Sequence, residues 1–142
     1  PGALALSLTS VVAMCTTAVP AMQAARWGRV VAITSIAVRQ PIANLILSNT
    51  ARAGVTGFLK TVAREVANDG VTVNSLQPGL HATDRVRQLY GDGPVSATGI
   101  PAGVLGEPAD FGAAVAFLCS QQAGYITGAH LLVAGGAYAG LL

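Results

Sequence analysis

The chain has 142 residues and a formal net charge of +2, and 52% of its residues are hydrophobic against 10% charged. This length suffices for one domain with a buried core, and the hydrophobic fraction is high for a soluble chain. The few charges form no basic stripe, which speaks against nucleic-acid binding. Cys15 and Cys119 lie in apolar segments without a Cys-x-x-Cys or histidine cluster, so we expect reduced core cysteines, no metal site and a cytoplasmic protein.

Residues 3–25 form an uncharged stretch that is long enough to cross a bilayer. Two interpretations are open: a membrane-spanning helix, or a helix of a soluble assembly whose apolar faces are covered by partners. The stretch is rich in alanine and contains Ser7, Pro20 and Gln23 instead of a block of leucine and phenylalanine. We therefore favour a helix buried on several sides, with no membrane.

A strand and a long helix follow. Residues 30–33 are an apolar, mostly β-branched run typical of a buried parallel strand, and the run leads to the hydroxyl of Ser35. Gly28 is the expected left-handed residue of the turn before this strand. Over 44–69 apolar residues recur at helical spacing, which predicts a helix with one buried stripe.

A second strand is predicted over 71–76, after a helix cap at Gly70, and it is stopped by Pro78 and Gly79. A strand, a helical connection and a strand form a right-handed crossover, so the two strands should be parallel neighbours whose carboxyl ends coincide. Open α/β sheets bind their ligands at that edge. We therefore expect Ser35 and the turn at Pro78 and Gly79 to lie on one rim.

The remaining third of the chain predicts a helix, a loop, another helix and a last strand. Thr83 or Asp84 suits the N-cap of the first helix, and Pro108 suits the first turn of the second. The glycine- and proline-rich connection between them is of the kind that often serves as a lid. The expected elements are a helix over 84–90, an irregular connection over 91–107, a helix over 108–120 and a strand over 130–133.

Several different short motifs lie along these segments. They are Gly28-Arg29-Val30-Val31 leading to Thr34-Ser35, Arg52-Ala53-Gly54-Val55, Val71-Thr72-Val73-Asn74 followed by Pro78-Gly79 and Thr83, Ile100-Pro101, Gly106-Glu107-Pro108, and Ile126-Thr127-Gly128 before Gly135-Gly136. Together they resemble the C-terminal half of the short-chain dehydrogenase/reductase family, Rossmann-fold oxidoreductases that include the 3-oxoacyl carrier-protein reductases. The resemblance implies an α/β fold, the C-terminal half of a Rossmann-like doubly wound parallel sheet with three strands and flanking helices. It makes 1–142 a partial domain, with the family's glycine-rich N-terminal half missing from the chain.

The resemblance also implies roles for single residues. Ser35 matches the family's serine, which hydrogen-bonds the substrate carbonyl or hydroxyl. Pro78, Gly79 and Thr83 match the turn that holds the nicotinamide carboxamide and the diphosphate. NAD or NADP is the implied cofactor, and the implied partners are a small carbonyl or alcohol substrate, such as a 3-oxoacyl compound, and further copies of the chain in a dimer or tetramer.

The sequence departs from the family at four places, one of which is Ala134, where the family has the aspartate of its Asp-Gly-Gly close. The family has a tyrosine thirteen residues after its serine and a lysine four residues further on, and these places hold Ser48 and Arg52. A serine hydroxyl lacks the acidity and the reach of a phenol, and an arginine keeps the positive charge but relays no proton. The family's helix asparagine falls at Ser7. The predicted catalytic set is therefore Ser35, Ser48 and Arg52, and Arg52 joins Pro78, Gly79 and Thr83 in cofactor binding.

Three functions stay open on these grounds. The first is an oxidoreductase with an atypical site whose proton comes from water or a substitute residue, for which Tyr90 is a candidate if it does not simply pack at the surface. The second is a catalytically impaired member that binds a dinucleotide or serves as an oligomer partner, and the third is a fragment without activity of its own. We expect His81 to make a backbone contact beside the cofactor turn and His130 to be structural.

Overall fold

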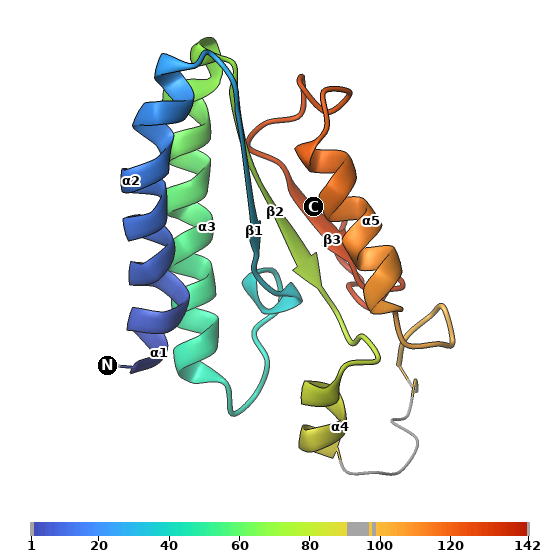
Figure 1. Cartoon of the computed structure of the whole chain (residues 1–142). Helices are drawn as coiled ribbons and strands as arrows, with labels where there is room; N and C mark the ends of the chain where they lie inside the picture. The colour runs from blue at the N-terminus through green and yellow to red at the C-terminus, as the bar shows by residue number, and fades with distance from the viewer. Residues whose placement is uncertain (1, 91–96, 98, 142) are drawn as a thin grey trace.

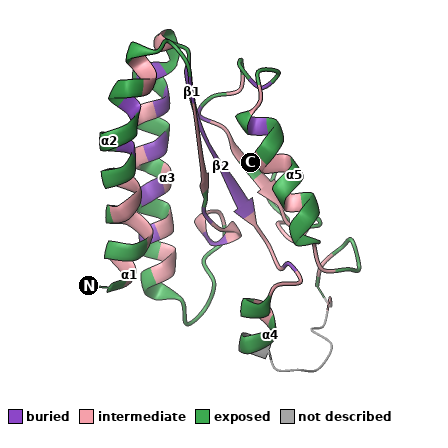
Figure 2. Ribbon diagram, in the orientation of Figure 1, coloured by how far each residue is buried: buried purple, intermediate pink, exposed green. Residues whose placement is uncertain are grey.

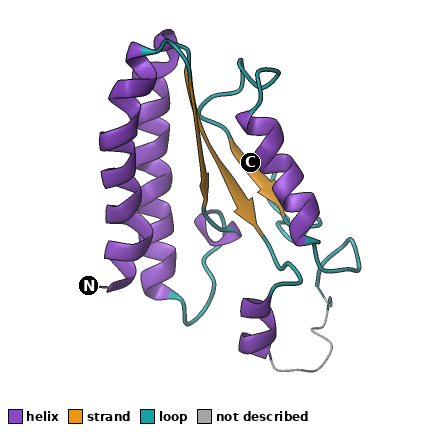
Figure 3. Cartoon of the chain, in the orientation of Figure 1, coloured by secondary structure: helices purple, strands orange, loops and turns teal. Residues whose placement is uncertain are grey.

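The computed structural model describes residues 2–90, 97 and 99–141, with only the backbone at 89 and 90. Its strands β1 (Gly28–Ile33), β2 (Val71–Pro78) and β3 (His130–Val133) form one parallel sheet in that order. One face is covered by α1 (Gly2–Leu4), the π-helical turn η1 (Ala5–Thr9), α2 (Ser10–Ala24) and α3 (Ile46–Val66), and the other face by α5 (Pro108–Cys119), as Figures 1 and 3 show. The remaining helices are the 3-10 turns η2 (Ile36–Val38) and η3 (Ala67–Asp69) and the short α4 (Asp84–Tyr90). The predicted fold class is confirmed.

The connection from β1 to β2 runs through α3, and the two strands are parallel neighbours, as the crossover order predicts. Between β1 and β2, the paired residues run from Gly28↔Val71 to Ile33↔Leu76. Between β2 and β3, they run from Ser75↔His130 to Pro78↔Val133. All three strands therefore end at the same edge of the sheet. In the described part of the chain, the other side of β1 carries no strand.

Side chains of β1 alternate between the two faces of the sheet, which is the pattern of a strand covered on both sides. Val30 and Ala32 pack into the core beneath α2 and α3, whereas Val31 packs into the core beneath α5. The buried residues of the first core are Cys15, Val19, Val55, Leu59, Ala63, Val66, Val71 and Val73. Those of the second, smaller core are Leu76, Leu118 and Ala123.

Helix α3 has the single buried stripe that its spacing predicts, made of Ala51, Val55, Leu59, Ala63 and Val66. The helix and η3 end at Gly70, whose φ of 74° is left-handed. A Cβ at Gly70 would collide with the carbonyl oxygen of Arg26, so this cap needs glycine for space as well as for conformation. The predicted helix end is confirmed.

The helix Gly2–Ala24 is buried on one side only (Figure 2). Its buried side chains are Cys15 and Val19, whereas Leu6 and Met14 are 77% and 62% exposed. Within this chain the helix contacts α3, β1 and β2, and the expected burial on several sides stays a prediction that depends on partner subunits. The helix is also long and apolar enough to cross a membrane, with a mean hydropathy of 1.8. Core helices of soluble proteins meet the same criteria of length and hydropathy.

Two local expectations are wrong. The left-handed residue of the turn before β1 is Arg26, with φ of 53°, and not Gly28. Gly28 is needed for space instead, because a Cβ there would lie 2.6 Å from Cβ of Met22. Both cysteines are free, as expected, but Cys119 is exposed; only Cys15 is in the core, where burial raises the pKa of its thiol.

The predicted lid lies partly outside the described residues, which omit 91–96 and 98. The rest of this connection packs on the carboxyl edge of the sheet. The N–H of Ala102 donates to the carbonyl oxygen of Gly135 at 2.9 Å, and the N–H of Gly106 donates to that of Leu80 at 3.1 Å. These bonds place the entry to α5 beside the end of β2.

Candidate functional site

Ser35 lies at the carboxyl end of β1, where the sequence predicts it. Its Oγ accepts a hydrogen bond from the N–H of Ala37 at 3.1 Å and caps η2. A hydroxyl that accepts one bond keeps its own O–H to donate, and that O–H donates to none of the described residues. The strand end therefore presents one free hydroxyl donor on the rim.

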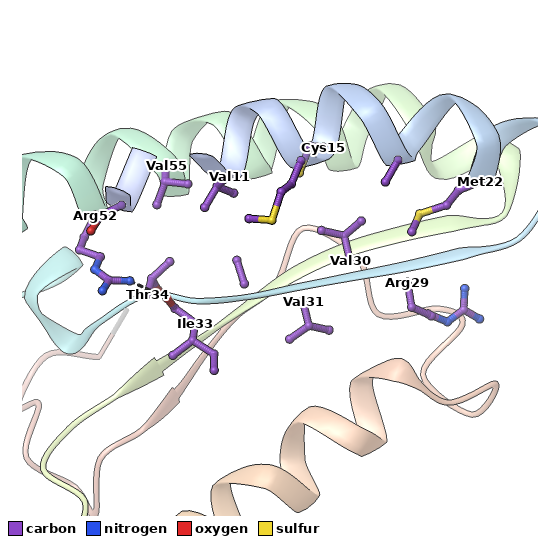
Figure 4. A pocket seen from close by; sticks show the side chains of 14 residues that line it. Val11, Cys15, Met22, Arg29, Val30, Val31, Ile33, Thr34, Arg52 and Val55 are labelled. Atoms are coloured by element: carbon purple, nitrogen blue, oxygen red, sulfur yellow. Dashed lines mark hydrogen bonds between the residues drawn. The ribbon is translucent and has the colours of Figure 1, made fainter. Parts of the chain in front are cut away.

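Arg52 reaches the same strand end from α3 (Figure 4). Its Nη1 donates to the carbonyl oxygen of Ile33 at 2.6 Å, on the side of β1 away from β2. Its Nε is buried and has no hydrogen-bond partner among the described residues. Burial also lowers the pKa of the guanidinium, although an arginine stays protonated at neutral pH. Buried donors are rarely left unpaired, so this Nε–H is an uncommon feature of the structure.

Ser48 lies one turn before Arg52, on the same face of α3, and is half-buried. Its hydroxyl makes no hydrogen bond with any residue that the structure describes. The loop before it is closed by Asn49, whose side-chain amide donates to the carbonyl oxygen of Ile42 at 2.9 Å. The structure thus brings Arg52 to the end of β1, whereas no described hydrogen bond joins Ser48 to Ser35.

The turn after β2 brings the ends of β2 and β3 close together. The N–H of Gly79 donates to the carbonyl oxygen of Val133 at 2.9 Å. A Cβ at Gly79 would lie 2.7 Å from Cβ of Ala134, so a side chain at this position would push the strand ends apart. Glycine therefore lets the turn after β2 pack closely against the end of β3.

A cavity of about 290 Å³ opens at this edge of the sheet. Its walls are Ile33, Pro78, Gly79, His81, Thr83, Val86, Pro108 and Phe111. Thr83 caps α4, since its Oγ1 accepts from the N–H of Val86 at 3.3 Å, and its O–H remains available as a donor. Apolar walls with a few polar groups are typical of small-molecule sites.

A second cavity, of about 470 Å³, runs along the unpaired edge of β1 beside α2 (Figure 4). Ser7 and Arg52 are among the residues that line it. Ser7 lies in η1, and π-helical turns are rare and often found at functional sites. Sequence reasoning places Ser7 only through the family resemblance, because the even apolar pattern of 3–25 gives no sign of a π-helical turn.

The two histidines make the contacts expected of them. His81 Nδ1 lies 3.1 Å from the backbone carbonyl oxygen of Gly79, in the turn after β2. His130 Nδ1 lies 2.8 Å from Oγ of Ser75 on the neighbouring strand. Burial lowers the pKa of His130, and the positive charges of Lys60 and Arg39 lower it further. His130 therefore joins β3 to β2 within the sheet, and His81 lies at the rim.

The side chain of Tyr90, the candidate replacement acid, lies outside the described residues. Within the described ranges, His, Cys, Asp and Glu side chains nowhere gather in the groups of three that a metal ion would need. The chemistry available on the described rim therefore comes from hydroxyls, the Arg52 guanidinium, the His81 imidazole and backbone groups.

Comparison with known proteins identifies the family. The protein-family model described as enoyl-(acyl carrier protein) reductase matches residues 2–138 of the chain. The 3-oxoacyl-[acyl-carrier-protein] reductase FabG of Vibrio cholerae is 40% identical over 133 residues, which are 93% of this chain and 54% of that protein. Nodulation protein G of Azospirillum brasilense is 37% identical over 134 residues, 94% of this chain and 54% of that protein. The chain thus spans about half the length of the curated relatives it matches.

Solved structures agree in fold. YwfH, described as an NADPH-dependent reductase involved in bacilysin biosynthesis, has a TM-score of 0.87 at 28% identity over 92% of this chain and 54% of its own. The TT0495 protein from Thermus thermophilus has a TM-score of 0.85 at 31% identity over 95% of this chain and 59% of its own. The family model covers nearly the whole chain, and the two solved structures share its fold over 92% and 95% of its length. The chain therefore belongs to the short-chain dehydrogenase/reductase family.

Proposed function

We propose that this chain carries part of the active site of an oxidoreductase that reduces the carbonyl group of a small molecule, such as a 3-oxoacyl compound, with NADH or NADPH. The names of relatives support the proposal: one is a 3-oxoacyl-[acyl-carrier-protein] reductase and one is described as an NADPH-dependent reductase. The observation that carries it is the convergence of Ser35, Arg52 and the turn at Gly79 on one rim of the sheet.

The residues of this rim fit a nicotinamide dinucleotide. Arg52 holds its guanidinium at the end of β1, and the hydroxyls of a ribose are acceptors of the kind that its further N–H groups can bind. The Thr83 hydroxyl keeps a free O–H in the wall of the cavity that Gly79 also lines, and it suits a carboxamide or a diphosphate, which need donors. When bound, the dinucleotide would supply the hydride for carbonyl reduction.

The protein's own groups would orient and polarise the substrate. The free O–H of Ser35 would donate to the carbonyl oxygen, where negative charge develops as the carbonyl is reduced. Arg52 would stabilise that charge at a distance without giving up a proton. Ser48 stands where the family has its tyrosine acid, and its hydroxyl is too weak an acid for that task. We therefore propose that proton donation, through water or a substitute residue, is the weak step of this site.

A second function is favoured by the same replacement of tyrosine and lysine. A catalytically impaired member would bind the dinucleotide and act as a subunit beside other copies of the chain. Under either function we propose a homo-oligomer, a dimer or a tetramer, located in the cytoplasm. The apolar exposed face of α2 supports an association between copies.

Two measurements on the protein at its natural length separate these functions. Calorimetry with NADH and NADPH measures dinucleotide binding, and the nicotinamide absorbance follows reduction of ketone, oxoacyl and quinone substrates. Binding with turnover supports the oxidoreductase, and binding without turnover supports the impaired member. Absence of binding would contradict both. A Ser35→Ala variant should retain dinucleotide binding and lose turnover, because it removes the carbonyl donor together with the acceptor that caps η2 and leaves Arg52 and Thr83 in place.

A further inference from the structure

His81 is a buried polar side chain that the proposed chemistry leaves without a task. It follows the turn after β2 and is 8% exposed. Its ring lies in the wall of the 290 Å³ cavity with Thr83, and also in the wall of a separate cavity of about 120 Å³ on the side of Gly135. His81 therefore divides the candidate cofactor cavity from the segment that leads into α5.

The imidazole is held in one orientation and one tautomer. Its Nδ1 lies 3.1 Å from the carbonyl oxygen of Gly79. A carbonyl oxygen only accepts, so Nδ1 carries the proton and donates. The ring also meets Phe111 edge-on, with ring centres 5.1 Å apart and an angle of 85° between the planes.

The opposite edge of the ring lies against Gly106. A Cβ at Gly106 would lie 2.5 Å from Cδ2 and 2.6 Å from Nε2 of His81, so only glycine leaves room for the imidazole. The backbones of the two segments are also paired, since Gly106 accepts from the N–H of Ala82 at 2.9 Å and donates to the carbonyl oxygen of Leu80 at 3.1 Å. His81 and Gly106 thus join the cofactor turn to the entry of α5.

We propose that His81 is a positioning residue for the dinucleotide: its Nδ1–H fixes the Gly79 carbonyl, and its ring keeps the turn and the entry of α5 in the arrangement that forms the cavity. This rests on the proposed function, in which the turn at Gly79 holds the dinucleotide. The hydrogen bond matters beyond packing, because a glycine turn without it has more backbone freedom to lose on binding.

Asparagine and leucine at position 81 separate the hydrogen bond from the packing. An asparagine amide places a donor close to the position of the imidazole Nδ1, whereas leucine fills a similar space without a donor. The natural-length protein and its His81→Asn and His81→Leu variants are titrated with NADH and NADPH, and their KM and kcat are measured with the best carbonyl substrate. His130→Asn is the matched control. It replaces the other histidine, which joins β3 to Ser75 of β2 and does not line the cavity.

We expect His81→Leu to raise the dissociation constant and the KM for the dinucleotide roughly 2- to 10-fold, the effect of one lost neutral hydrogen bond, with little change in kcat. His81→Asn should restore both values to within about twofold of the unmodified protein, and His130→Asn should leave them unchanged. Gly106→Ala should weaken binding as His81→Leu does, because the added Cβ would displace the ring, and it tests the proposal even where His81→Leu fails to fold.

Three outcomes would overturn the inference. In the first, the unmodified protein binds the dinucleotide and both His81→Leu and Gly106→Ala bind it equally well. In the second, folded His81→Asn loses as much affinity as His81→Leu, which assigns His81 a packing role only. In the third, the unmodified protein binds no dinucleotide, which refutes the proposed function first and the inference with it.

Discussion

Arg52 combines a fixed position with an unused donor. Its Nη1 is tied to the carbonyl oxygen of Ile33, which holds the guanidinium at the end of β1, while the buried Nε–H has no described partner. The unpaired buried Nε–H costs stability, and the other N–H groups of the guanidinium are the donors that a cofactor would meet.

We therefore predict that Arg52→Ala in the natural-length protein weakens dinucleotide binding by about 1.5–3 kcal/mol, the range for a hydrogen bond to a charged group. Arg64→Ala is the matched control, because Arg64 is an exposed arginine on the same helix. Calorimetry should show a loss for Arg52→Ala alone. Equal affinities for the two variants would contradict the role proposed for Arg52.

His130 makes stability depend on pH. Burial, followed by the charges of Lys60 and Arg39, lowers its pKa below the ordinary value of 6.5, so the folded protein favours the neutral imidazole that contacts Ser75. At a pH between the pKa of His130 in the folded protein and its value of 6.5 in the unfolded chain, the unfolded chain binds more protons. The stabilisation by neutral His130 is therefore complete above pH 6.5 and is lost as the pH falls toward the pKa of the folded state.

We predict that the urea midpoint of the natural-length protein falls between about pH 7.5 and pH 5, and that His130→Gln reduces this fall. The carboxylates contribute equally to both proteins, so the difference between the two curves isolates His130. Parallel curves would show that His130 titrates alike in the folded and unfolded states.

At the scale of elements, α3 links the first core to the site. Leu59 is fully buried in the middle of its apolar stripe, and Arg52 and Ser48 lie nearer its beginning. The core beneath α3 therefore positions the guanidinium at the end of β1.

We predict that Leu59→Ala lowers the free energy of unfolding by about 2–5 kcal/mol, the cost of a cavity in a packed core. Leu47→Ala makes the same chemical change on the same helix at a side chain that is 55% exposed, and should cost less than about 0.5 kcal/mol. Denaturant unfolding of the natural-length variants measures both. Similar losses would mean that α3 does not pack as described.

Most elements follow from local patterns in the sequence. The apolar run at 30–33, the stripe of α3 and the cap at Gly70 predict their structures because each depends on neighbours along the chain. The common edge for Ser35 and the turn at Gly79 follows from crossover topology. These features need no knowledge of tertiary contacts.

The features that the sequence does not predict depend on contacts between distant segments. Gly28 resembles a turn residue, and only the side chain of Met22 against it reveals a different reason for glycine. The unpaired Nε–H of Arg52 and the placement of His81 against Gly106 likewise arise from packing of separate elements. Motif spacing finds the residues of a site, but not the hydrogen bonds that they make.

At the scale of the whole molecule, residues 1–142 leave large apolar surfaces open. The unpaired edge of β1 borders a cavity of about 470 Å³, and the helix Gly2–Ala24 exposes most of one face. Unpaired strand edges and exposed apolar patches both promote association.

We therefore predict that a protein consisting of residues 1–142 alone is insoluble or molten, without a cooperative monomeric transition. Size-exclusion chromatography with light scattering and a thermal melt followed by near-ultraviolet circular dichroism test this. A monodisperse monomer with a sharp transition would show that these surfaces need no cover.

The most direct test of the whole site is the rate of carbonyl reduction by the natural-length protein and by its Ser48→Tyr/Arg52→Lys double variant. Ser35 and the turn at Gly79 retain the groups that orient substrate and cofactor, and the double variant supplies a phenol with a cation beside it to lower its pKa. General acid catalysis contributes about 10²–10⁴-fold, so the double variant should reduce ketone, oxoacyl or quinone substrates faster by a large part of that factor. If the unmodified protein turns over rapidly and the double variant is slower, Ser48 and Arg52 form a working site of another design, and proton donation is not its weak step.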